Sequence, residues 1–296
     1  MRIMNRFFRW LRWSVLMVLL PLRAEEVDVY LLGGQSNMQG IAKVADLPAG
    51  FPSAFARVRF WNGKAFEPLT PGRTRTSTRE GEFGPELGFA FGLGESGRPV
   101  HLIKDHASGM PLHHGWNGNR WEGGEPAPGR RNFHPGGSPD DANTGLLYRA
   151  MIVRFRAGLE FLRSEGHTPV VRGFLWMQGE QDSKEAVSAG EYAASLKQLR
   201  RRVAEDVGAT PDLPFAFGQV LPHEPALERF THRAEIRDQM AAADEHSGRP
   251  EAMRHARMIS TDGFGLLPDL VHYDADGQFR LGRAFAQAMR ELQDRR

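Results

Sequence analysis

The chain has 296 residues, 41% of them hydrophobic and 25% charged, and no cysteine, which predicts a globular protein and excludes disulfide bonds and a cysteine-linked lipid anchor. The isoelectric point near 9.1 depends on five arginines within residues 1–24, a segment without acidic residues. The rest of the chain is slightly acidic, so it offers no electrostatic basis for binding nucleic acid.

Residues 1–24 have the plan of a secretory signal peptide: a basic region, an apolar run at residues 13–20, and Ala24 at the cleavage position. The apolar run is shorter than the ~20 residues that cross a bilayer. Cleavage after Ala24 leaves residues 25–296 as a mature domain that is secreted or periplasmic and has no stable membrane span. An uncleaved amphipathic anchor is the alternative that the sequence leaves open.

The first predicted strand leads directly to a polar turn. An apolar run at residues 27–32 predicts a buried strand, which Gly33 and Gly34 end. Glycine permits tight turns with positive φ, so Ser36 can be held at the exposed edge of a sheet. Open α/β sheets bind ligands at the carboxyl ends of their strands, and a serine there is a candidate nucleophile. Equally, Ser36 can cap the helix that follows.

The remaining elements alternate between strands and helices. Strands are expected at residues 57–61 and 65–69, around an Asn-Gly turn, and at 99–104, 170–176, 215–220 and 256–260. Helices are expected at residues 83–93, 144–164, 189–206, 231–246 and 278–292. The glycines of the first helix indicate close packing against a strand, and residues 70–82 are expected to form a surface loop. This alternation predicts a single doubly wound three-layer α/β/α domain with a parallel sheet.

The long segment from His113 to Asn143 is rich in Gly, Pro, Trp and Asn and contains no predicted helix or strand. Loops of this length are usually functional or disordered. Its rings fit a platform for carbohydrate, and they fit equally well an attachment of the loop to the body of the protein. These side chains are Trp116, Trp121, Phe133, His113, His114 and His134.

Polar residues follow three predicted strands: Ser36, the Ser108-Gly109 pair, and Gln178. A fourth polar segment, from Asp269 to His272, precedes the last helix. The carboxyl ends of parallel strands open on one edge of the sheet, so these segments can converge. A serine hydroxyl becomes nucleophilic when a histidine takes its proton, and that histidine needs a carboxylate partner. Ser36, His272 and Asp269 are therefore candidates for a catalytic triad.

Acyl transfer also requires hydrogen-bond donors for a tetrahedral oxyanion, each worth roughly 3–4 kcal/mol. The backbone N–H groups of Ser36 and Gly109 and the side-chain amide of Gln178 are the candidate donors. Each residue also has an ordinary structural interpretation. Asp269 can cap a helix, Gln178 can bind loop backbone, and Ser108-Gly109 can form a simple turn.

Other chemistries fit the sequence less well. The histidines lack a metal-ligand spacing such as His-Glu-x-x-His, so no metal site is predicted. Glu180 and Asp182 are a carboxylate pair of the type that cleaves glycosides. Residues two apart on a loop have no fixed geometry for that reaction.

Several segments resemble, in order, those of the SGNH hydrolase superfamily, specifically its branch of sialate O-acetylesterases and acetylxylan esterases, similar to carbohydrate esterase family 6. Gly34-Gln35-Ser36-Asn37-Met38 resembles the nucleophile block, and Trp176-x-Gln178-Gly179-Glu180-x-Asp182 the third block. Asp269-x-x-His272 resembles the last block. The Phe83-to-Glu86 helix start and the Lys104-to-Leu112 turn also lie in family order. The likeness covers about residues 27–292.

The resemblance implies a flavodoxin-like SGNH fold with Ser36 as nucleophile, His272 as base and Asp269 as the acid that orients it. It assigns the oxyanion hole to the N–H of Ser36, the Gly109 turn and Gln178. Asn37, Glu180 and Asp182 are the implied supporting residues. Relatives often carry Gly-Gly where this chain has Ser108-Gly109-Met110, so the resemblance does not decide between the N–H groups of Ser108 and Gly109.

The implied function is a serine esterase that hydrolyses acetyl esters on carbohydrate, such as acetylated xylan, sialic acid or a similar glycan, without metal or cofactor. One alternative is a short-chain esterase or lipase for other acyl esters, with Met110 and Leu112 as an apolar cleft wall. The other alternative is a catalytically silent carbohydrate-binding protein on the same scaffold. The joint presence of Ser36, Asp269, His272 and Gln178 favours an enzyme, because a binding protein has no need of all four.

Overall fold

A seven-stranded sheet in the order β11-β10-β9-β1-β6-β3-β4 forms the centre of the computed structural model, which describes residues 25–94 and 97–294. All neighbouring strands are parallel except the edge pair β3–β4. The strands are β1 (Glu26–Gly34), β3 (Val58–Trp61), β4 (Phe66–Pro68), β6 (Val100–His106), β9 (Thr168–Met177), β10 (Phe215–Gly218) and β11 (Ala256–Ile259). The predicted signal peptide, residues 1–24, lies outside the described residues.

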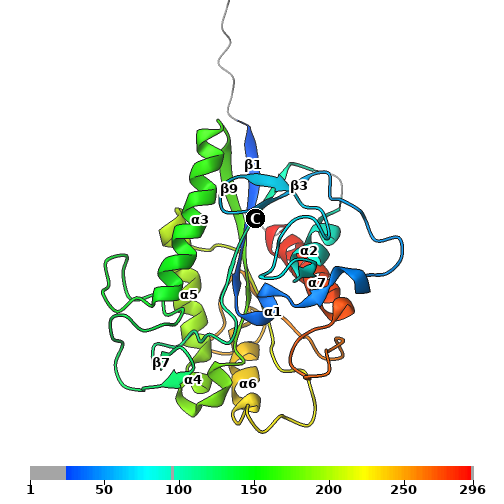
Figure 1. Cartoon of the computed structure of the whole chain (residues 1–296). Coiled ribbons are helices and arrows are strands. Elements are labelled where there is room, and N and C mark those ends of the chain that lie inside the picture. The colour runs from blue at the N-terminus through cyan, green and yellow to red at the C-terminus, as the bar shows by residue number, and fades with distance from the viewer. Residues whose placement is uncertain (1–24, 95–96, 295–296) are drawn as a thin grey trace, which may run out of the picture.

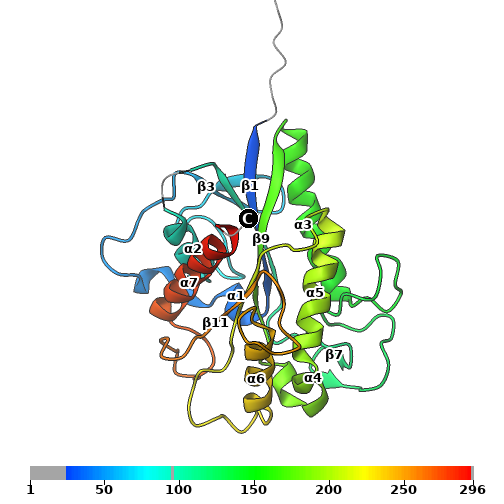
Figure 2. The ribbon, with the colours of Figure 1, turned by 180° about the vertical axis from the view of Figure 1, so that it is seen from behind.

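Helices cover both faces of the sheet, as predicted, so the fold is a three-layer α/β/α arrangement (Figure 1, Figure 2). On one face lie α2 (Glu86–Leu93) and α7 (Ala275–Gln293). On the other lie α3 (Leu146–Ser164) and α5 (Tyr192–Val207), with α6 (Arg233–Ala243) packed beside α5. Shorter helices are α1 (Ser36–Gln39) and α4 (Ala186–Gly190), with single turns at Val44–Asp46 and Asp182–Lys184. Within residues 25–94 and 97–294, no helix is both long and apolar enough to span a bilayer.

The order of the strands fixes where a ligand site can form. After β1 the chain forms β3, β4 and β6 on one side of β1, and then β9 on its other side. The direction of winding therefore reverses at β1, and open α/β sheets bind ligands at such a switch point. Gly34, at the carboxyl end of β1, pairs with His106 of β6 and Met177 of β9. The turns after these three strands consequently lie next to one another.

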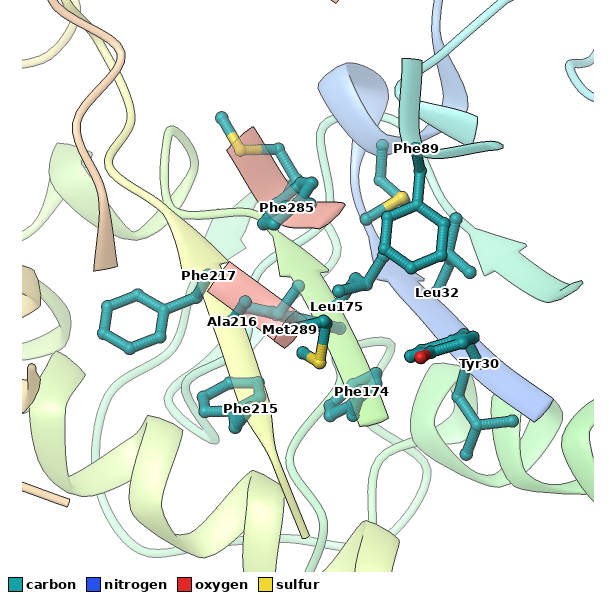
Figure 3. Packing of buried hydrophobic residues seen from close by; sticks show 14 of the residues in the cluster. Tyr30, Leu32, Phe89, Phe174, Leu175, Phe215, Ala216, Phe217, Phe285 and Met289 are labelled. Carbon is teal, nitrogen blue, oxygen red and sulfur yellow. The ribbon is translucent and has the colours of Figure 1, made fainter. Parts of the chain in front are cut away.

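Alternating side chains of the strands fill the two layers of core. Tyr30 of β1 packs edge-on against Phe89 of α2, with ring centroids 5.0 Å apart (Figure 3). Phe174 of β9 stacks on Phe215 of β10 at 5.4 Å, and Phe155 of α3 packs against Phe174. Each fully buried large apolar side chain contributes about 1.5–3 kcal/mol, so these layers hold the strands rigidly beneath the turns that follow them.

The glycines of α2 have a different partner from the one predicted. They pack against α7 rather than against a strand, because both helices lie on the same face of the sheet. A Cβ at Gly88 would lie 2.2 Å from the carbonyl oxygen of Phe279, and one at Gly92 would lie 2.6 Å from the Cβ of Ala286. Glycine is therefore required by a close helix–helix contact, which a sequence pattern alone does not distinguish from a helix–strand contact.

The expectation of a surface loop at residues 70–82 is only partly correct. Thr74, Thr76 and Ser77 are buried, and the Ser77 hydroxyl donates to the carbonyl oxygen of Gly40 at 2.5 Å. The segment ends in β5 (Glu82–Phe83), which pairs with β2 (Ala42–Lys43). This pairing ties the segment to the chain that follows the Ser36 turn.

Candidate active site

Ser36, His272 and Asp269 form a continuous hydrogen-bonded chain. The Oγ of Ser36 lies 2.9 Å from Nε2 of His272, and Nδ1 of His272 lies 2.5 Å from Oδ2 of Asp269. Ser36 is the first residue of α1 at the switch point, whereas the other two residues lie in the loop before α7. The structure therefore brings Ser36 next to His272, which lies 236 positions later in the sequence.

A tight turn holds the histidine. The second carboxylate oxygen of Asp269 accepts the backbone N–H groups of Val271 and His272, both at 3.0 Å. Leu270, which lies between Asp269 and Val271, has a φ of +61°. Partial burial raises the pKa of Asp269, but the hydrogen bonds from His272 and Val271 outweigh this effect, so its pKa lies below the ordinary value. Asp269 is thus held as a carboxylate aimed at the imidazole.

Gly34 and Asn37 fix the turn that carries Ser36. Gly34 has a φ of +151°, and a Cβ there would lie 2.1 Å from the carbonyl oxygen of Met177. Asn37 donates to Glu180 Oε1 at 2.6 Å and to the carbonyl oxygen of Val271 at 3.1 Å. Its own Oδ1 accepts the backbone N–H of Tyr273 at 3.1 Å. Asn37 therefore ties the serine turn to the histidine loop.

The two carboxylates expected to support the site, Glu180 and Asp182, are both buried. Asp182 accepts the backbone N–H groups of Leu112 and His113 at 2.8 and 2.9 Å, and the Gln178 amide at 2.6 Å. Burial raises the pKa of Asp182 and that of Glu180, and hydrogen bonds to both groups oppose the shift. Glu180 borders the cleft and accepts from Asn37 of the serine turn, whereas Asp182 is not in the cleft wall and accepts from the turn after β6.

Gln178 does not reach the cleft. Its side chain is 0% exposed. Its amide nitrogen lies 2.6 Å from Asp182 Oδ2, 3.1 Å from the carbonyl oxygen of Met110 and 3.2 Å from Gln35 Oε1. Its amide oxygen accepts the Tyr192 hydroxyl at 2.8 Å. A direct role of Gln178 as an oxyanion donor stays a prediction that these contacts do not support.

The turn after β6 borders the cleft through Ser108 and Gly109, which has a φ of +68°. The next backbone N–H, that of Met110, donates to the carbonyl oxygen of Ala107 at 3.3 Å. The N–H groups of Ser36, Ser108 and Gly109 have no acceptor within the described part of the chain. They remain available to an oxygen atom in the cleft.

The cleft beside Ser36 has a volume of about 540 Å³. Besides the predicted residues, its walls include Gln35, Ile41, Lys184, Arg229 and Phe230, which sequence reasoning missed. Lys184 and Arg229 lie over the Phe230 ring, at 5.8 and 5.1 Å from its centroid. Arg229 and Phe230 follow β10, whose carboxyl end opens on the same edge of the sheet as those of β9 and β1. Because ligands bind at this edge, the position of the two residues after a predicted strand could have indicated them as cleft residues.

The long segment at residues 113–143 contributes no wall to this cleft. Trp116 and Phe133 are buried, and the Trp116 indole donates to the Ser188 hydroxyl at 3.1 Å. The segment also contains a small hairpin, β7 (Trp116–Asn117) and β8 (Arg120–Trp121). The sequence left two roles open for this segment, a platform for carbohydrate and attachment of the loop to the body of the protein. The burial of Trp116 and Phe133 fits attachment.

The side chains of the described residues include no group of three or more His, Cys, Asp or Glu residues that could hold a metal ion.

Met110 and Leu112, which were expected as an apolar wall in an esterase for other acyl groups, do not border the cleft. Its apolar surface comes instead from Ile41, Phe230 and Val271.

Comparisons with known structures agree with this fold. A protein from Arabidopsis thaliana has a TM-score of 0.63 at 17% identity, covering 89% of this chain and 98% of its own. The protein NanS has a TM-score of 0.62 at 15% identity, with coverages of 93% and 100%. A carbohydrate acetylesterase from Xanthomonas citri has a TM-score of 0.61 at 20% identity, with coverages of 91% and 57%. At these identities the likeness shows the fold alone.

A search of curated proteins gave no match. The family model described as "Carbohydrate esterase, sialic acid-specific acetylesterase" matches residues 26–291, nearly the whole of the described chain. The match agrees with the resemblance drawn from the sequence blocks, and with the enzyme class of carboxylic ester hydrolases. The chain therefore belongs to the sialic acid-specific acetylesterase family of carbohydrate esterases.

Proposed function

We propose that the protein is a serine esterase that removes O-acetyl groups from carbohydrate, with Ser36 as nucleophile, His272 as general base and Asp269 as the acid that orients it. The observation that carries the proposal is the hydrogen-bonded chain from Ser36 Oγ through the imidazole to Asp269, at the edge of a cleft. Membership of an acetylesterase family supports the acetyl group as the group transferred.

In the first half-reaction, Ser36 Oγ forms a bond to the acetyl carbonyl carbon while its proton passes to Nε2 of His272. The carbonyl oxygen becomes an oxyanion, which the N–H groups of Ser36 and Gly109 are positioned to stabilise. Asp269, hydrogen-bonded to Nδ1, stabilises the imidazolium that forms. Collapse of this intermediate breaks the bond to the sugar oxygen, and the imidazolium returns its proton to that oxygen.

In the second half-reaction, water attacks the acetyl group on Ser36 while His272 takes a proton from the water. A second oxyanion forms at the same donors, and its collapse releases acetate and restores the Ser36 hydroxyl. The acetyl group offers little binding energy of its own, so the sugar must supply most of it.

The cleft favours a sugar that bears a carboxylate, as sialic acid does, over the neutral xylose units of xylan. Lys184 and Arg229 are the cations of the cleft wall. Replacing Arg229 by glutamine is expected to raise the KM for O-acetylated sialic acid about two- to fivefold, the size of an exposed charge contact. The KM for p-nitrophenyl acetate, which has no carboxylate, serves as the control. Equal KM changes for both substrates would contradict this preference.

Two other functions receive less support. An esterase for larger acyl groups would need a longer apolar wall than Ile41, Phe230 and Val271 provide. A silent binding protein would have no need of the chain of hydrogen bonds from Ser36 to Asp269.

We also propose that residues 25–296 form one esterase domain and that the protein is exported through the signal peptide at residues 1–24. N-terminal sequencing of the protein recovered outside the cytoplasm tests this proposal. A chain that begins at Glu25 is the expected result, and a chain that retains residues 1–24 would contradict cleavage.

Acetate release from p-nitrophenyl acetate, O-acetylated sialic acid and acetylated xylan tests the proposed activity. We expect release from the first two substrates by the wild-type protein, and none above background by the Ser36→Ala and His272→Ala variants. No release from any of the three substrates by a folded wild-type protein would contradict the proposal.

A further inference from the structure

A second hollow, which we call the side hollow, adjoins the cleft beside Ser36. Ile41 and Ser108 border both, and the side hollow extends from them to Lys43 and Arg131. Its volume is about 810 Å³, whereas that of the cleft is about 540 Å³. Sites of ~300–1,000 Å³ hold one drug-sized ligand, so the cleft alone can take a single acetylated sugar. The side hollow therefore offers room for a further part of the substrate.

The protein's own contacts hold the walls of the side hollow in place. On one wall, β2 and β5 form an antiparallel pair in which Lys43 lies opposite Glu82. On another, the Ser108 hydroxyl donates to Oε1 of Gln39 at 2.7 Å, and both residues border the hollow. A site whose walls are already ordered loses less free energy when it binds a ligand.

Positive charge predominates in the side hollow. Its wall contains Lys43, Arg79 and Arg131 and a single carboxylate, that of Glu82. Oε1 of Glu82 lies 2.6 Å from Lys43 Nζ and 3.9 Å from an Arg79 guanidinium nitrogen, so two of the cations share this carboxylate. The chain after its first 24 residues is slightly acidic as a whole, and a hollow of the opposite sign attracts anions.

The guanidinium of Arg131 is available to a ligand. Its backbone is fixed, because its N–H donates to Asn117 Oδ1 at 3.1 Å and its carbonyl oxygen accepts the N–H of Gly118 at 2.9 Å. The side chain is exposed, and within the part of the chain that the structure describes it has no ion pair and no hydrogen bond. Arginine presents parallel N–H donors that match the two oxygens of a carboxylate.

The cations of the cleft and of the side hollow form two separate sets. Lys184 and Arg229 border only the cleft, and Arg131 borders only the side hollow. A single sialic acid has one carboxylate and can contact one of these sets. A chain whose next sugar also bears a carboxylate can contact both at once.

We infer that the side hollow binds the neighbouring sugar of an acidic oligosaccharide, with Arg131 donating hydrogen bonds to the carboxylate of that sugar. The preferred substrate is then a chain of carboxylate-bearing sugars, and a free acetylated monosaccharide is a weaker one. The inference rests on the proposed esterase function and extends it beyond the acetylated sugar.

Kinetics on a monomer and a trimer test this inference. The probes are O-acetylated N-acetylneuraminic acid and its O-acetylated linear trimer, with concentrations counted per acetyl group. We expect the wild-type KM to be about two- to fivefold lower for the trimer, the size of an exposed charge contact. Arg131→Gln should remove this advantage, and Arg131→Lys should keep most of it because lysine keeps the charge. A wild-type KM that is no lower for the trimer, or an equal advantage in Arg131→Gln, would contradict the inference.

Arg120→Gln is the matched control. Arg120 is an exposed arginine of the same long segment, in β8, and it borders neither hollow. This variant is expected to keep the wild-type ratio of the two KM values, and an equal loss in it would show a general effect of charge and contradict the assignment to Arg131. Raising the salt from about 50 to 500 mM should shrink the trimer advantage, because salt screens exposed charges. An advantage that salt leaves unchanged would contradict recognition of a carboxylate.

Binding to Ser36→Ala separates failure of the inference from failure of the proposed function. This variant lacks the proposed nucleophile, so calorimetry can measure the Kd for the monomer and the trimer without turnover. A lower Kd for the trimer, lost when Arg131→Gln is added, supports the inference even if the wild-type protein releases no acetate, a result that contradicts the function alone. Acetate release by the wild-type protein, combined with equal Kd values for monomer and trimer, contradicts the inference alone.

Discussion

Replacing Lys104 by methionine tests the ion pair beneath the Ser36 turn. Lys104 Nζ lies 2.7 Å from Glu86 Oε2, and the two side chains are 1% and 0% exposed. The same nitrogen donates to the carbonyl oxygen of Gln39 at 3.0 Å, while Glu86 also accepts the backbone N–H of Gly84 at 2.9 Å. Burial lowers the pKa of Lys104, and the Glu86 carboxylate opposes this shift.

Lys104→Met leaves the Glu86 carboxylate buried without a countercharge and the Gln39 carbonyl without its donor. Breaking a buried pair from one side costs about 3–5 kcal/mol, so the free energy of unfolding should fall by that amount. Adding Glu86→Gln removes the uncompensated charge and keeps an acceptor for Gly84, and should recover at least half of the loss. Such a recovery would show that most of the lost stability comes from the buried, unpaired Glu86 carboxylate and less from the loss of the ion pair itself.

Urea unfolding followed by tryptophan fluorescence measures these differences. Arg98→Met is the control, because the Arg98–Glu26 pair has side chains 50% and 52% exposed and should contribute less than about 1 kcal/mol. A Lys104→Met protein within 1 kcal/mol of wild type, or a double variant no more stable than Lys104→Met, would refute the reasoning.

Three further predictions concern the turn, the triad and pH. Asp269→Asn keeps the shape of the side chain but changes the hydrogen bond to Nδ1 of His272, and kcat should fall about 10⁴-fold at unchanged Tm; a loss below tenfold would contradict its role. Gly34→Ala combines an unfavourable φ with a clash at Met177 and should lower the free energy of unfolding by about 3 kcal/mol or more, measured in urea; a stable Gly34→Ala would show that the turn relaxes. Burial, aided by the charges of His167 and Arg59, lowers the pKa of His101 from 6.5 to about 4, so below pH 6.5 the unfolded chain binds a proton that the folded chain does not. The contribution of His101 to stability should therefore fall by at most about 1.4 kcal/mol per pH unit between pH 6.5 and 4, and His101→Phe should reduce the overall slope by up to that amount; an equal slope in both proteins would contradict it.

Hydrophobic periodicity predicted the architecture well because it reports burial. Most residues of the runs at 27–32, 99–104 and 215–220, and residues 173–176 of the run at 170–176, are buried. Strands buried on both faces of a parallel sheet read as continuous apolar segments. The order of the strands could not be read in this way. It depends on which crossover each helix makes, and periodicity carries no information about that.

The triad was predictable because its residues lie in segments that resemble known sequence blocks, at a strand end and before the last helix. Ser36 and Asp269 each lie within hydrogen-bond distance of His272. Gln178 and Gln35 show the limit of such reasoning. Both are glutamines at strand ends, and only the structure shows that Asp182 and Tyr192 enclose the Gln178 amide whereas Gln35 borders the cleft.

The cleft walls were the least predictable part. Phe230 is an ordinary aromatic residue in a loop, and its place beside Ser36 depends on the long-range packing of β10 against β9. Conversely, the aromatic residues of 113–143 looked like a binding surface, but Phe133 packs into the main core against Trp176, and Trp116 is buried and bonds Ser188 of α4. Composition alone cannot separate exposed rings from buried ones.

Mass spectrometry of the protein quenched in acid during turnover of p-nitrophenyl acetate tests the central claim most directly. The proposed mechanism predicts a single acetyl group on the peptide that contains Ser36, and none on the same peptide of the Ser36→Ala variant, which should also release no acetate. Turnover by the wild-type protein without acetylation of Ser36, or full turnover by Ser36→Ala, would contradict the assignment of Ser36 as the nucleophile.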